Sequence, residues 1–236
     1  LQSLPKKEFV LVFIGDAAQL PSVGPGNVLR ELILCEKIPH VALNKIFRQE
    51  DTSDIVLNSH QINRGSTQLY NTKKDFIFME IENEEDTLKK LITIVEALQD
   101  KSYQVLSPTY KGILGVSNIN KTLQEVLNPK FDSAKEFKTE ICTFREEDKV
   151  MVIKNDYKNE VYNGEKGTLV GINNQSKKLE IFIDGKTIEY TFRDAYSMLA
   201  LDYSRTIHKA QGQEYDFVVM PFVNYFSVQL QRNLLY

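Results

Sequence analysis

Hydrophobic residues first gather in one short, uninterrupted run near the start of the chain. Residues 9–14 read Phe-Val-Leu-Val-Phe-Ile, and Gly15 and Asp16 follow directly. A short, wholly apolar run ending in Gly-Asp is typical of a buried parallel strand that delivers polar groups to the carboxyl edge of a sheet. Open α/β sheets bind their ligands at that edge. The long polar side chain of Gln19 then lies in a Gly/Pro-rich loop whose backbone can approach a ligand closely.

Apolar spacing further along the chain predicts the helices and short strands of an α/β fold. Helices are predicted over 26–34, from the N-cap Ser53 to about Asn63 with Gly65 closing it, over 86–98, and over 115–127 before Asn128-Pro129. Short strands are predicted over 40–43, 76–81 and 103–106, and the stretch 218–222 returns to the α/β pattern after the region described next.

From Ile141 the hydrophobic pattern changes to that of closely spaced strands. Short runs with strand character cover 149–154, 167–172, 179–184 and 187–192. Asn163-Gly164 and Asp184-Gly185 are tight-turn signals between some of these runs. Four or five short strands within about 55 residues suggest a small β-barrel.

Composition adds only broad limits to this picture. The 236 residues can hold one large or two modest domains, and the 42% hydrophobic and 26% charged residues are ordinary for a soluble globular protein. No apolar run reaches the roughly 18 residues that a membrane span needs. The net charge of −3 does not mark a nucleic-acid binder. A motor that stacks single-stranded bases and touches few phosphates nevertheless needs no strongly basic domain.

Cysteine and histidine usage argues against disulfide and metal chemistry. Cys35 and Cys142 lie far apart and no signal-peptide pattern opens the chain, which fits a reducing cytoplasm. His40, His60 and His208 are scattered along the sequence, so we expect no metal site.

Five polar segments carry the candidate chemistry. In chain order they are Gly15-Asp-Ala-Ala-Gln-Leu-Pro-Ser-Val-Gly-Pro-Gly26, Leu43-Asn-Lys-Ile-Phe-Arg-Gln49, Gln104-Val-Leu-Ser-Pro-Thr-Tyr-Lys-Gly112, Thr206-Ile-His-Lys-Ala-Gln-Gly-Gln-Glu-Tyr-Asp216 and Arg232-Asn-Leu-Leu-Tyr236. They resemble, respectively, motif III, motif IV, the opening of the second motor domain, motif V and the beginning of motif VI of RecD-like superfamily 1 DNA helicases. The matches follow the family's order and bracket almost the whole chain.

This resemblance implies a fold class and a domain plan. It implies RecA-like P-loop NTPase motor domains, with part of the first and most of the second in this chain, and a small SH3-like β-barrel insert. The C-terminal part of the first motor domain would occupy 1–72. The second motor domain would occupy 73–141 and 197–236, and the insert 142–196.

On the nucleotide side, the resemblance implies roles for Asp16, Gln19, Arg48, Gly212 and Glu214. A neutral amide can hold a γ-phosphate and orient water, so Gln19 would sense the phosphate with Asp16 in support. The guanidinium of Arg48 offers a planar fork for phosphate oxygens, which makes Gln19 and Arg48 the catalytic candidates. Gly212 allows backbone approach, and Glu214 would face the sugar or phosphates.

On the DNA side, the candidates lie in two segments. They are Pro108, Thr109 and Lys111 in the first segment, and Thr206, His208, Lys209 and Gln211 in the second. In the family, Thr206 and His208 would touch the DNA backbone. A hydroxyl and a lysine beside a glycine, as in Thr109 and Lys111, suit phosphate contacts, although a plain strand-to-helix turn explains them nearly as well.

Two further pairs of residues, one charged and one aromatic, have roles that the sequence leaves open. Just before motif V, Asp202 and Arg205 are spaced to pair with each other. Tyr157 and Tyr162 could stack on bases or pack in the barrel.

A P-loop is absent from the sequence. No Gly-x-x-x-x-Gly-Lys-Ser/Thr occurs in the 236 residues, and no Asp-Glu pair precedes Phe9 to hold Mg²⁺. We therefore interpret the chain as an internal fragment of a longer helicase whose ATP and Mg²⁺ ligands lie mainly elsewhere. We expect it not to hydrolyse ATP alone, and measurable DNA-stimulated turnover by the purified chain would contradict this.

Alternative functions stay open at the level of sequence. The chain could be the motor of a conjugative relaxase–helicase, or a non-catalytic single-stranded DNA-binding module. A stand-alone helicase and an exodeoxyribonuclease V alpha subunit, with further exonuclease subunits as partners, look alike. Movement in the 5′-to-3′ direction and a role in DNA repair or recombination are implied by the resemblance alone.

Overall fold

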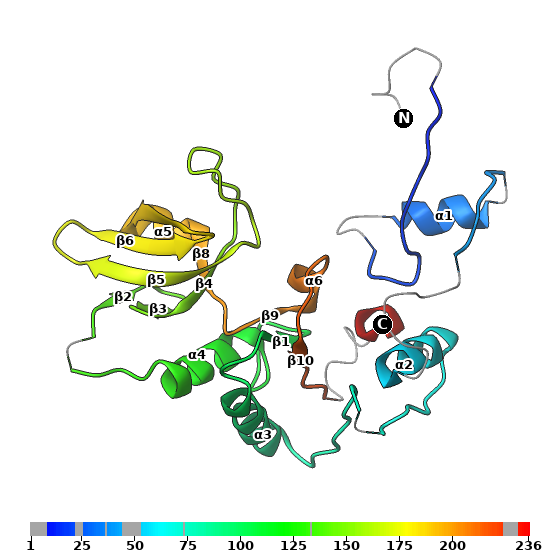
Figure 1. Cartoon of the computed structure of the whole chain (residues 1–236), viewed down its shortest axis with the longest axis horizontal. Helices are drawn as coiled ribbons and strands as arrows, with labels where there is room; N and C mark the ends of the chain where they lie inside the picture. Colours follow the sequence, from blue (N-terminus) through cyan, green and yellow to red (C-terminus); the bar gives the residue numbers. More distant parts are fainter. Residues whose placement is uncertain are drawn as a thin grey trace. The chain divides into compact units, whose positions relative to one another are not determined.

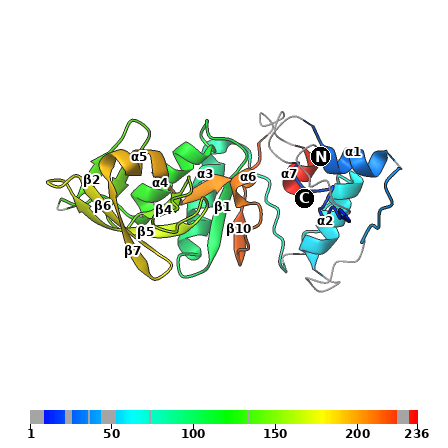
Figure 2. The same cartoon turned by 90° about the horizontal axis from the view of Figure 1, so that it is seen from above.

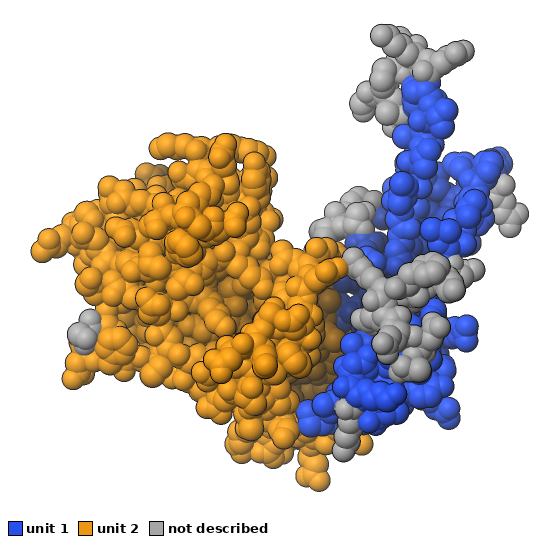
Figure 3. Space-filling model, in the orientation of Figure 1, with its two compact units in different colours: residues 1–79, 230–236 blue, residues 80–229 orange. Residues whose placement is uncertain are grey.

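The computed structural model describes residues 9–21, 26–35, 37–43, 53–72, 74–132, 134–223 and 231–236. The chain divides into two compact units, of which the first holds Leu1–Met79 with Leu230–Tyr236 and the second holds Glu80–Gln229 (Figure 3). The C-terminal residues thus group with the first unit, whereas the sequence put 197–236 in the second motor domain. A hydrogen bond joins these residues to the rest of the first unit, because Arg232 Nη1 donates to Asn63 O at 3.4 Å. The predicted domain ranges otherwise stay predictions.

Two helices of the first unit begin at residues whose side chains cap the helix N-terminus, and one of them ends at a glycine. Helix α1 (Val28–Leu34) is capped by Asn27, and helix α2 (Asp54–Arg64) by Ser53, whose hydroxyl accepts from Val56 N at 3.3 Å. Gly65 ends α2 in the left-handed region, with φ +80°, and its N–H donates to the carbonyl oxygens of Gln61 and Ile62 in the last turn. Both helices confirm the sequence prediction. A short helix, α7 (Arg232–Leu235), packs on α2.

The predicted strands over 9–14, 40–43 and 76–81 do not form, and these predictions are wrong. Within the part of the chain that the structure describes, no strand pairs with them, and Val10 and Ile14 are 90% and 94% exposed. An apolar run becomes a strand only when a neighbour completes its ladder. In 76–81, Phe78 instead exchanges two hydrogen bonds with the Asn71 side chain, at 2.9 and 3.0 Å.

The second unit contains a parallel α/β part. Its elements are α3 (Glu84–Ala97), β1 (Tyr103–Ser107), α4 (Val116–Leu127), β9 (Ser204–Thr206), α6 (Ile207–Ala210) and β10 (Phe217–Val219). The strands pair in the order β10-β1-β9, all parallel (Figure 1). The helices predicted over 86–98 and 115–127 and the strand predicted over 103–106 are confirmed, with shifted ends, and the α/β pattern expected at 218–222 is represented by β10.

An antiparallel insert interrupts this α/β part between α4 and β9. Its elements are β2 (Glu136–Lys138), β3 (Thr143–Arg145), β4 (Lys149–Val152), β5 (Lys166–Asn173), β6 (Lys178–Ile183), β7 (Lys186–Thr191), α5 (Phe192–Met198) and β8 (Leu199–Leu201). The larger sheet has the order β7-β6-β5-β4-β8, and β2 pairs with β3. Asp184 and Gly185 make the tight β6–β7 turn at φ 46° and 79°, as their sequence predicts. All four predicted strands form, while closure into a barrel stays a prediction.

One hydrophobic core runs through the α/β part and the insert. Leu91 and Val95 of α3 and Ile119 and Leu123 of α4 are fully or almost fully buried in it. The same cluster continues into the insert through Phe144, Val150, Val152, Leu169, Ile172, Leu179, Ile181 and Tyr203. Figure 2 shows β5–β7 at one end of this unit and β1 and β10 at the other. Because the core is continuous, we expect insert and motor part to unfold together.

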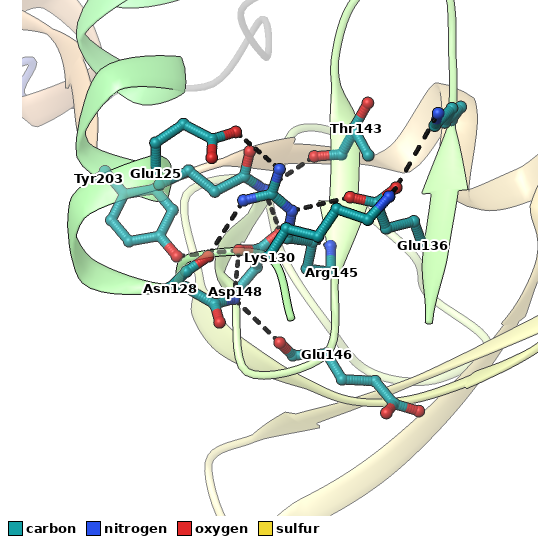
Figure 4. Close-up of polar contacts among 11 residues, drawn as sticks. Glu125, Asn128, Lys130, Glu136, Thr143, Arg145, Glu146, Asp148 and Tyr203 are labelled. Atoms are coloured by element: carbon teal, nitrogen blue, oxygen red, sulfur yellow. Dashed lines mark hydrogen bonds and ion pairs between the residues drawn. The ribbon is translucent and has the colours of Figure 1, made fainter. Parts of the chain in front are cut away.

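A buried polar network joins the insert to α4 (Figure 4). Asp148 is fully buried, and Gln124 and Asn128 donate to its two carboxylate oxygens at 2.6 and 2.8 Å. Arg145 N and the Tyr203 hydroxyl donate to the same carboxylate at 2.6 and 2.9 Å. Burial, together with the negative charge of Asp148, raises the pKa of Tyr203, so its hydroxyl keeps its proton and stays a donor.

Arg145 forms a second, more exposed layer of this network. Its guanidinium donates to Glu136 at 2.9 Å, to Glu125 at 2.6 Å and to Asn128 O at 3.1 Å. The Arg145 and Lys130 side chains hold the pKa of Glu136 below its usual range. The layer ties β2 and β3 to the end of α4.

The two cysteines are expected to differ strongly in reactivity. Cys142 is partly buried, and that burial raises the pKa of its thiol to about 11, whereas Cys35 is exposed. Because the thiolate is the nucleophile, Cys142 should be alkylated roughly 100-fold more slowly than an ordinary thiol at pH 8. Iodoacetamide labelling followed by mass spectrometry measures both rates. In guanidinium the difference should vanish, and equal native rates in the wild type would contradict the assignment.

Candidate nucleic-acid and nucleotide sites

The two segments predicted to contact DNA begin at the same edge of the parallel sheet. Strands β1 and β9 are neighbours, and their last residues, Ser107 and Thr206, are register partners. The segment from Pro108 to Lys111 and the helix α6 therefore leave adjacent carboxyl ends. This is the edge at which open α/β sheets bind ligands.

The loop after β1 is shaped by its own hydrogen bonds. The Ser107 hydroxyl donates to Leu114 O at 2.7 Å, and the Thr109 hydroxyl donates to Lys111 O at 2.7 Å. A Cβ added to Gly115 would lie 2.3 Å from Lys111 O, so only glycine fits where the loop closes. Pro108 is buried, Thr109 is partly buried and Lys111 is exposed. Thr109 and Lys111 are thus the members of this group that a ligand could reach.

Motif V turns directly from strand into helix. Thr206 ends β9, is 7% exposed, and accepts from Lys209 N at 3.4 Å as the N-cap of α6. His208 and Lys209 are exposed on the single turn that follows. Gly212 then takes φ +78° to leave the helix, as only a residue tolerant of the left-handed region does easily.

A pocket of about 250 Å³ brings motif V against the insert. His208, Lys209, Gln211 and Gln213 line it on one side. Met151, Asn163 and Gly164 line it on the other. Of the predicted DNA candidates, His208, Lys209 and Gln211 therefore share one cavity, while Thr206 supports the helix beneath them.

The predicted pairing of Asp202 with Arg205 is confirmed. Arg205 Nε donates to Asp202 Oδ1 at 2.9 Å, and a second, shorter contact joins Arg205 Nη2 to Asp202 Oδ2. Both side chains are buried, at 1% and 5% exposure. Behind the pair, Lys166 donates to Gln104 at 3.1 Å and lies 4.3 Å above the Tyr215 ring. Burial lowers the pKa of Lys166.

In the first unit, the Asp16–Gln19 loop forms a compact turn. Asp16 Oδ1 accepts from Ala18 N at 2.9 Å, and Asp16 Oδ2 accepts from Gln19 Nε2 at 3.2 Å. The loop and α1 enclose a pocket of about 390 Å³ that Asp16, Gln19 and Leu29 help to line. Asp16 thus holds the amide of Gln19, while the other N–H of that amide stays available for a ligand.

The other nucleotide-binding candidates, Arg48, Gly212 and Glu214, lie elsewhere in the sequence. Arg48 and the other residues of 44–50 lie outside the described residues. Gly212 and Glu214 belong to the second unit, where both are exposed.

The described residues contain neither a metal cluster nor a membrane-spanning helix. No group of three or more His, Cys, Asp or Glu side chains there could hold a metal ion. No helix of that part is long and apolar enough to cross a bilayer.

Gln213 is the pocket residue that sequence reasoning did not single out. Its neighbours Gly212 and Glu214 were candidates, yet a lone glutamine after a glycine carries no signal of its own. Asn163 of the pocket was recognised only as a turn residue. What distinguishes Gln213 is its contact with Arg205, which the structure alone reveals.

Three family models match successive parts of the chain. An AAA domain matches 1–79, an ATP-dependent RecD-like DNA helicase SH3 domain matches 119–182, and a UvrD-like helicase C-terminal domain matches 203–236. The SH3 model begins within α4, in agreement with the core that α4 shares with the insert. Together with the α/β fold, these matches point to the class of helicase motor proteins.

Comparison with individual proteins shows which helicases the chain is similar to. The chain is 30% identical to the ATP-dependent RecD2 DNA helicase of Deinococcus radiodurans, over all of this chain and 32% of that protein. It is 25% identical to the RecBCD enzyme subunit RecD of Buchnera aphidicola subsp. Acyrthosiphon pisum, over 98% of this chain and 47% of that protein. The chain is thus similar to RecD-like DNA helicases, and it spans about a third to a half of the length of these relatives.

A solved structure supports the fold. The Pif1 helicase from Bacteroides, crystallised with ADP-AlF3 and single-stranded DNA, aligns with a TM-score of 0.53. The alignment covers 89% of this chain and 55% of that one, at 19% sequence identity. At this identity the likeness concerns the fold alone.

Proposed function

We propose that this chain is part of an ATP-dependent DNA helicase that couples ATP hydrolysis to movement along single-stranded DNA and to unwinding of a duplex. The observation that carries the proposal is the register pair Ser107–Thr206, which starts two polar segments at one sheet edge. The names of the relatives, an ATP-dependent DNA helicase and a RecBCD subunit, agree with it.

The single strand would follow the exposed donors of these two segments. Lys111 and Lys209 supply positive charge for phosphates, and Thr109 and His208 supply further hydrogen-bonding groups. Only a few cations are involved, which is compatible with the net charge of −3. Gln211 would contact the strand from the same pocket, and Thr206 would hold α6 in place.

The nucleotide would be bound by residues other than those proposed to contact the DNA. Gln19, oriented by Asp16, would contact the γ-phosphate of ATP, and Arg48 would stabilise the charge on it during transfer. Gly212 and Glu214 are the nucleotide-binding candidates that the second unit contributes. Bound Mg²⁺ would neutralise phosphate charge, but the described residues supply no metal cluster, and we assign it no ligand in this chain.

The wider setting is also a proposal, and it rests on the resemblance to RecD-like helicases. We place the chain in DNA repair or recombination, in the cytoplasm, with 5′-to-3′ movement. Other subunits of an exonuclease V complex are proposed partners, since one relative is a RecBCD subunit. The motor would use the domain plan 1–72, 73–141 with 197–236, and 142–196.

The test is binding of a fluorescein-labelled oligothymidine to the 236-residue chain, measured by anisotropy over a salt series. We expect salt-dependent binding, weakened about five- to tenfold by His208→Ala, in keeping with loss of one hydrogen bond. Lys209→Ala should also lower the slope of log K against log salt by about 0.7. Both side chains are exposed, so neither variant should lower the melting temperature.

A matched control is Lys90→Ala, which removes an exposed lysine of α3 that does not line the pocket. It should leave affinity and slope unchanged. Absence of binding at every salt concentration, or equal effects of Lys209→Ala and Lys90→Ala, would contradict the proposed DNA path.

A further inference from the structure

We propose that Gln213 is an additional contact for the backbone of the single strand, and that Asp202 and Arg205 are positioning residues that aim its amide nitrogen into the pocket. This inference rests on the proposed function. It adds a binding residue and the support behind it.

The orientation of the Gln213 amide follows from what its neighbours can donate. Arg205 Nη1 lies 3.4 Å from Gln213 Oε1, and the Tyr215 hydroxyl lies 3.2 Å from the same oxygen. A guanidinium has donors only, so the atom that faces Arg205 must be the amide oxygen. The amide nitrogen, Nε2, is therefore turned away from Arg205.

The nitrogen points toward the insert side of the pocket. Nε2 lies 3.6 Å from the position that a Cβ on Gly164 would take, so it faces the turn at Asn163-Gly164. Gln213 and Gly164 line the same cavity as His208 and Lys209. The amide is thus a fixed neutral donor beside a cation.

The support behind Gln213 is rigid because it is buried. Arg205 is 1% exposed and is held by Asp202 through both Nε and Nη2. A buried ion pair adds little net stability, because desolvation offsets its attraction, and apolar side chains of similar size often replace one without loss. What an apolar pair could not provide is the donor that fixes the Gln213 oxygen.

The chemistry of the pocket favours a phosphodiester as ligand. Phosphate oxygens are acceptors only, and they match the N–H groups of Gln213 and the ammonium of Lys209. A neutral amide releases no counterion, so its contribution should not depend on salt as that of a lysine does. This difference separates the two contacts experimentally.

The decisive substitution is Gln213→Glu, measured in the oligothymidine assay. Glutamate keeps the shape and an oxygen for Arg205, but it replaces the N–H donors by a second oxygen that repels phosphate. We expect at least about tenfold weaker binding with an unchanged or raised melting temperature, since the Arg205 contact gains charge. Gln213→Ala should weaken binding about fivefold with an unaltered salt slope. Wild-type affinity in Gln213→Glu would overturn the contact.

The positioning role is tested by removing the support. The double variant Asp202→Leu/Arg205→Met replaces the buried pair by apolar side chains of similar length and should remain folded. Its affinity should fall to about that of Gln213→Ala, and adding Gln213→Ala to it should cost almost nothing more. Full additivity of the two effects would overturn the positioning role.

A second variant covers the case in which the double variant does not fold. Tyr215→Phe removes the other donor to Gln213 Oε1 and leaves the ion pair in place. It should weaken binding about two- to threefold, and only when Gln213 is present. An equal loss in the Gln213→Ala background would count against positioning.

Different results would contradict the Gln213 contact and the proposed function. If His208→Ala and Lys209→Ala weaken binding but Gln213→Glu does not, the DNA path stands and only the Gln213 contact is lost. If the wild-type chain does not bind the oligonucleotide, the proposed function itself fails.

Discussion

Replacement of Asp148 by alanine is expected to destabilise the second unit by about 3–5 kcal/mol. The carboxylate is fully buried and accepts from Gln124 and Asn128 of α4, from Arg145 N, and from the Tyr203 hydroxyl. Alanine would leave Arg145 N and the Tyr203 hydroxyl without this acceptor in a place that water does not reach, while Gln124 and Asn128 would keep only their bonds to Thr143 O and Glu146 O. An unpaired buried donor costs the full desolvation of the group, about 1–3 kcal/mol, so the losses accumulate.

The measurement is urea unfolding followed by circular dichroism, because the chain contains no tryptophan for fluorescence. The matched control is Asp100→Ala, which removes an exposed carboxylate after α3 and should change the unfolding free energy by less than about 0.5 kcal/mol. A loss below about 1 kcal/mol for Asp148→Ala would contradict the network as described.

A related variant separates charge from shape. Asp148→Asn keeps the volume but turns one acceptor oxygen into an NH₂ group that faces other donors. It should therefore be closer to Asp148→Ala than to the wild type in unfolding free energy. Near-wild-type stability would mean that the hydrogen bonds at one oxygen can rearrange.

The sequence predicted correctly those features that depend only on residues a few positions apart in the chain. Ser53 and Gly65 bound α2 because a hydroxyl N-cap and a left-handed C-cap act on their immediate neighbours. Asp202 and Arg205 pair because they are three residues apart and both are long enough to meet. The hairpin at Asp184-Gly185 needs only the two turn residues.

Sequence reasoning failed where a partner lies far along the chain. The run 9–14 has the composition of a strand, but strand formation depends on a neighbour, and the described residues provide none. Asp148 follows Glu146 and Glu147, so it looks like the end of a solvated acidic run. Its actual partners lie up to 55 residues away, at Tyr203.

The candidate site shows the same division. His208, Lys209 and Gln211 could be found because they stand inside a recognisable motif, and the structure brings them into one pocket. Gln213 could not be found, since its orientation depends on a buried arginine eight residues earlier whose own position depends on Asp202. The pocket's other wall, at Asn163-Gly164, comes from the insert, which no local pattern connects to motif V.

Replacement of Asn120 by aspartate is expected to cost about 3–5 kcal/mol and to abolish most oligonucleotide binding. The Asn120 side chain lies in α4 and is 8% exposed. Its Nδ2 donates to Leu201 O at 3.3 Å and to Ser204 O at 3.2 Å, and its Oδ1 accepts from Ser204 N at 2.7 Å. Aspartate would place a buried negative charge against two carbonyl oxygens.

The functional part of this prediction follows from where the amide acts. Leu201 is the last residue of the insert strand β8, and Ser204 is the first residue of the motor strand β9. One side chain thus fixes the crossing from insert to motor sheet, and Thr206 and α6 follow it directly. A displaced β9 would carry the exposed donors of motif V away from the loop at Lys111.

Asn120→Ala tests this link in a milder form. It removes the hydrogen bonds without adding charge and should cost about 2–3 kcal/mol. In the fraction that stays folded at low temperature, the oligothymidine affinity should still fall about tenfold, although Asn120 does not line the pocket. Asn174→Asp, an exposed substitution in the β5–β6 turn, serves as the control and should change neither quantity.

The two readouts together decide whether α4 supports only the fold or also the site. If Asn120→Ala loses stability and keeps full affinity, the crossing can shift without moving α6, and the sheet edge is not set by this amide. If affinity falls in step with the folded fraction alone, the effect is on folding. A loss of affinity beyond the unfolded fraction is the result we expect, because Ser204 and Thr206 belong to one short strand and cannot move independently.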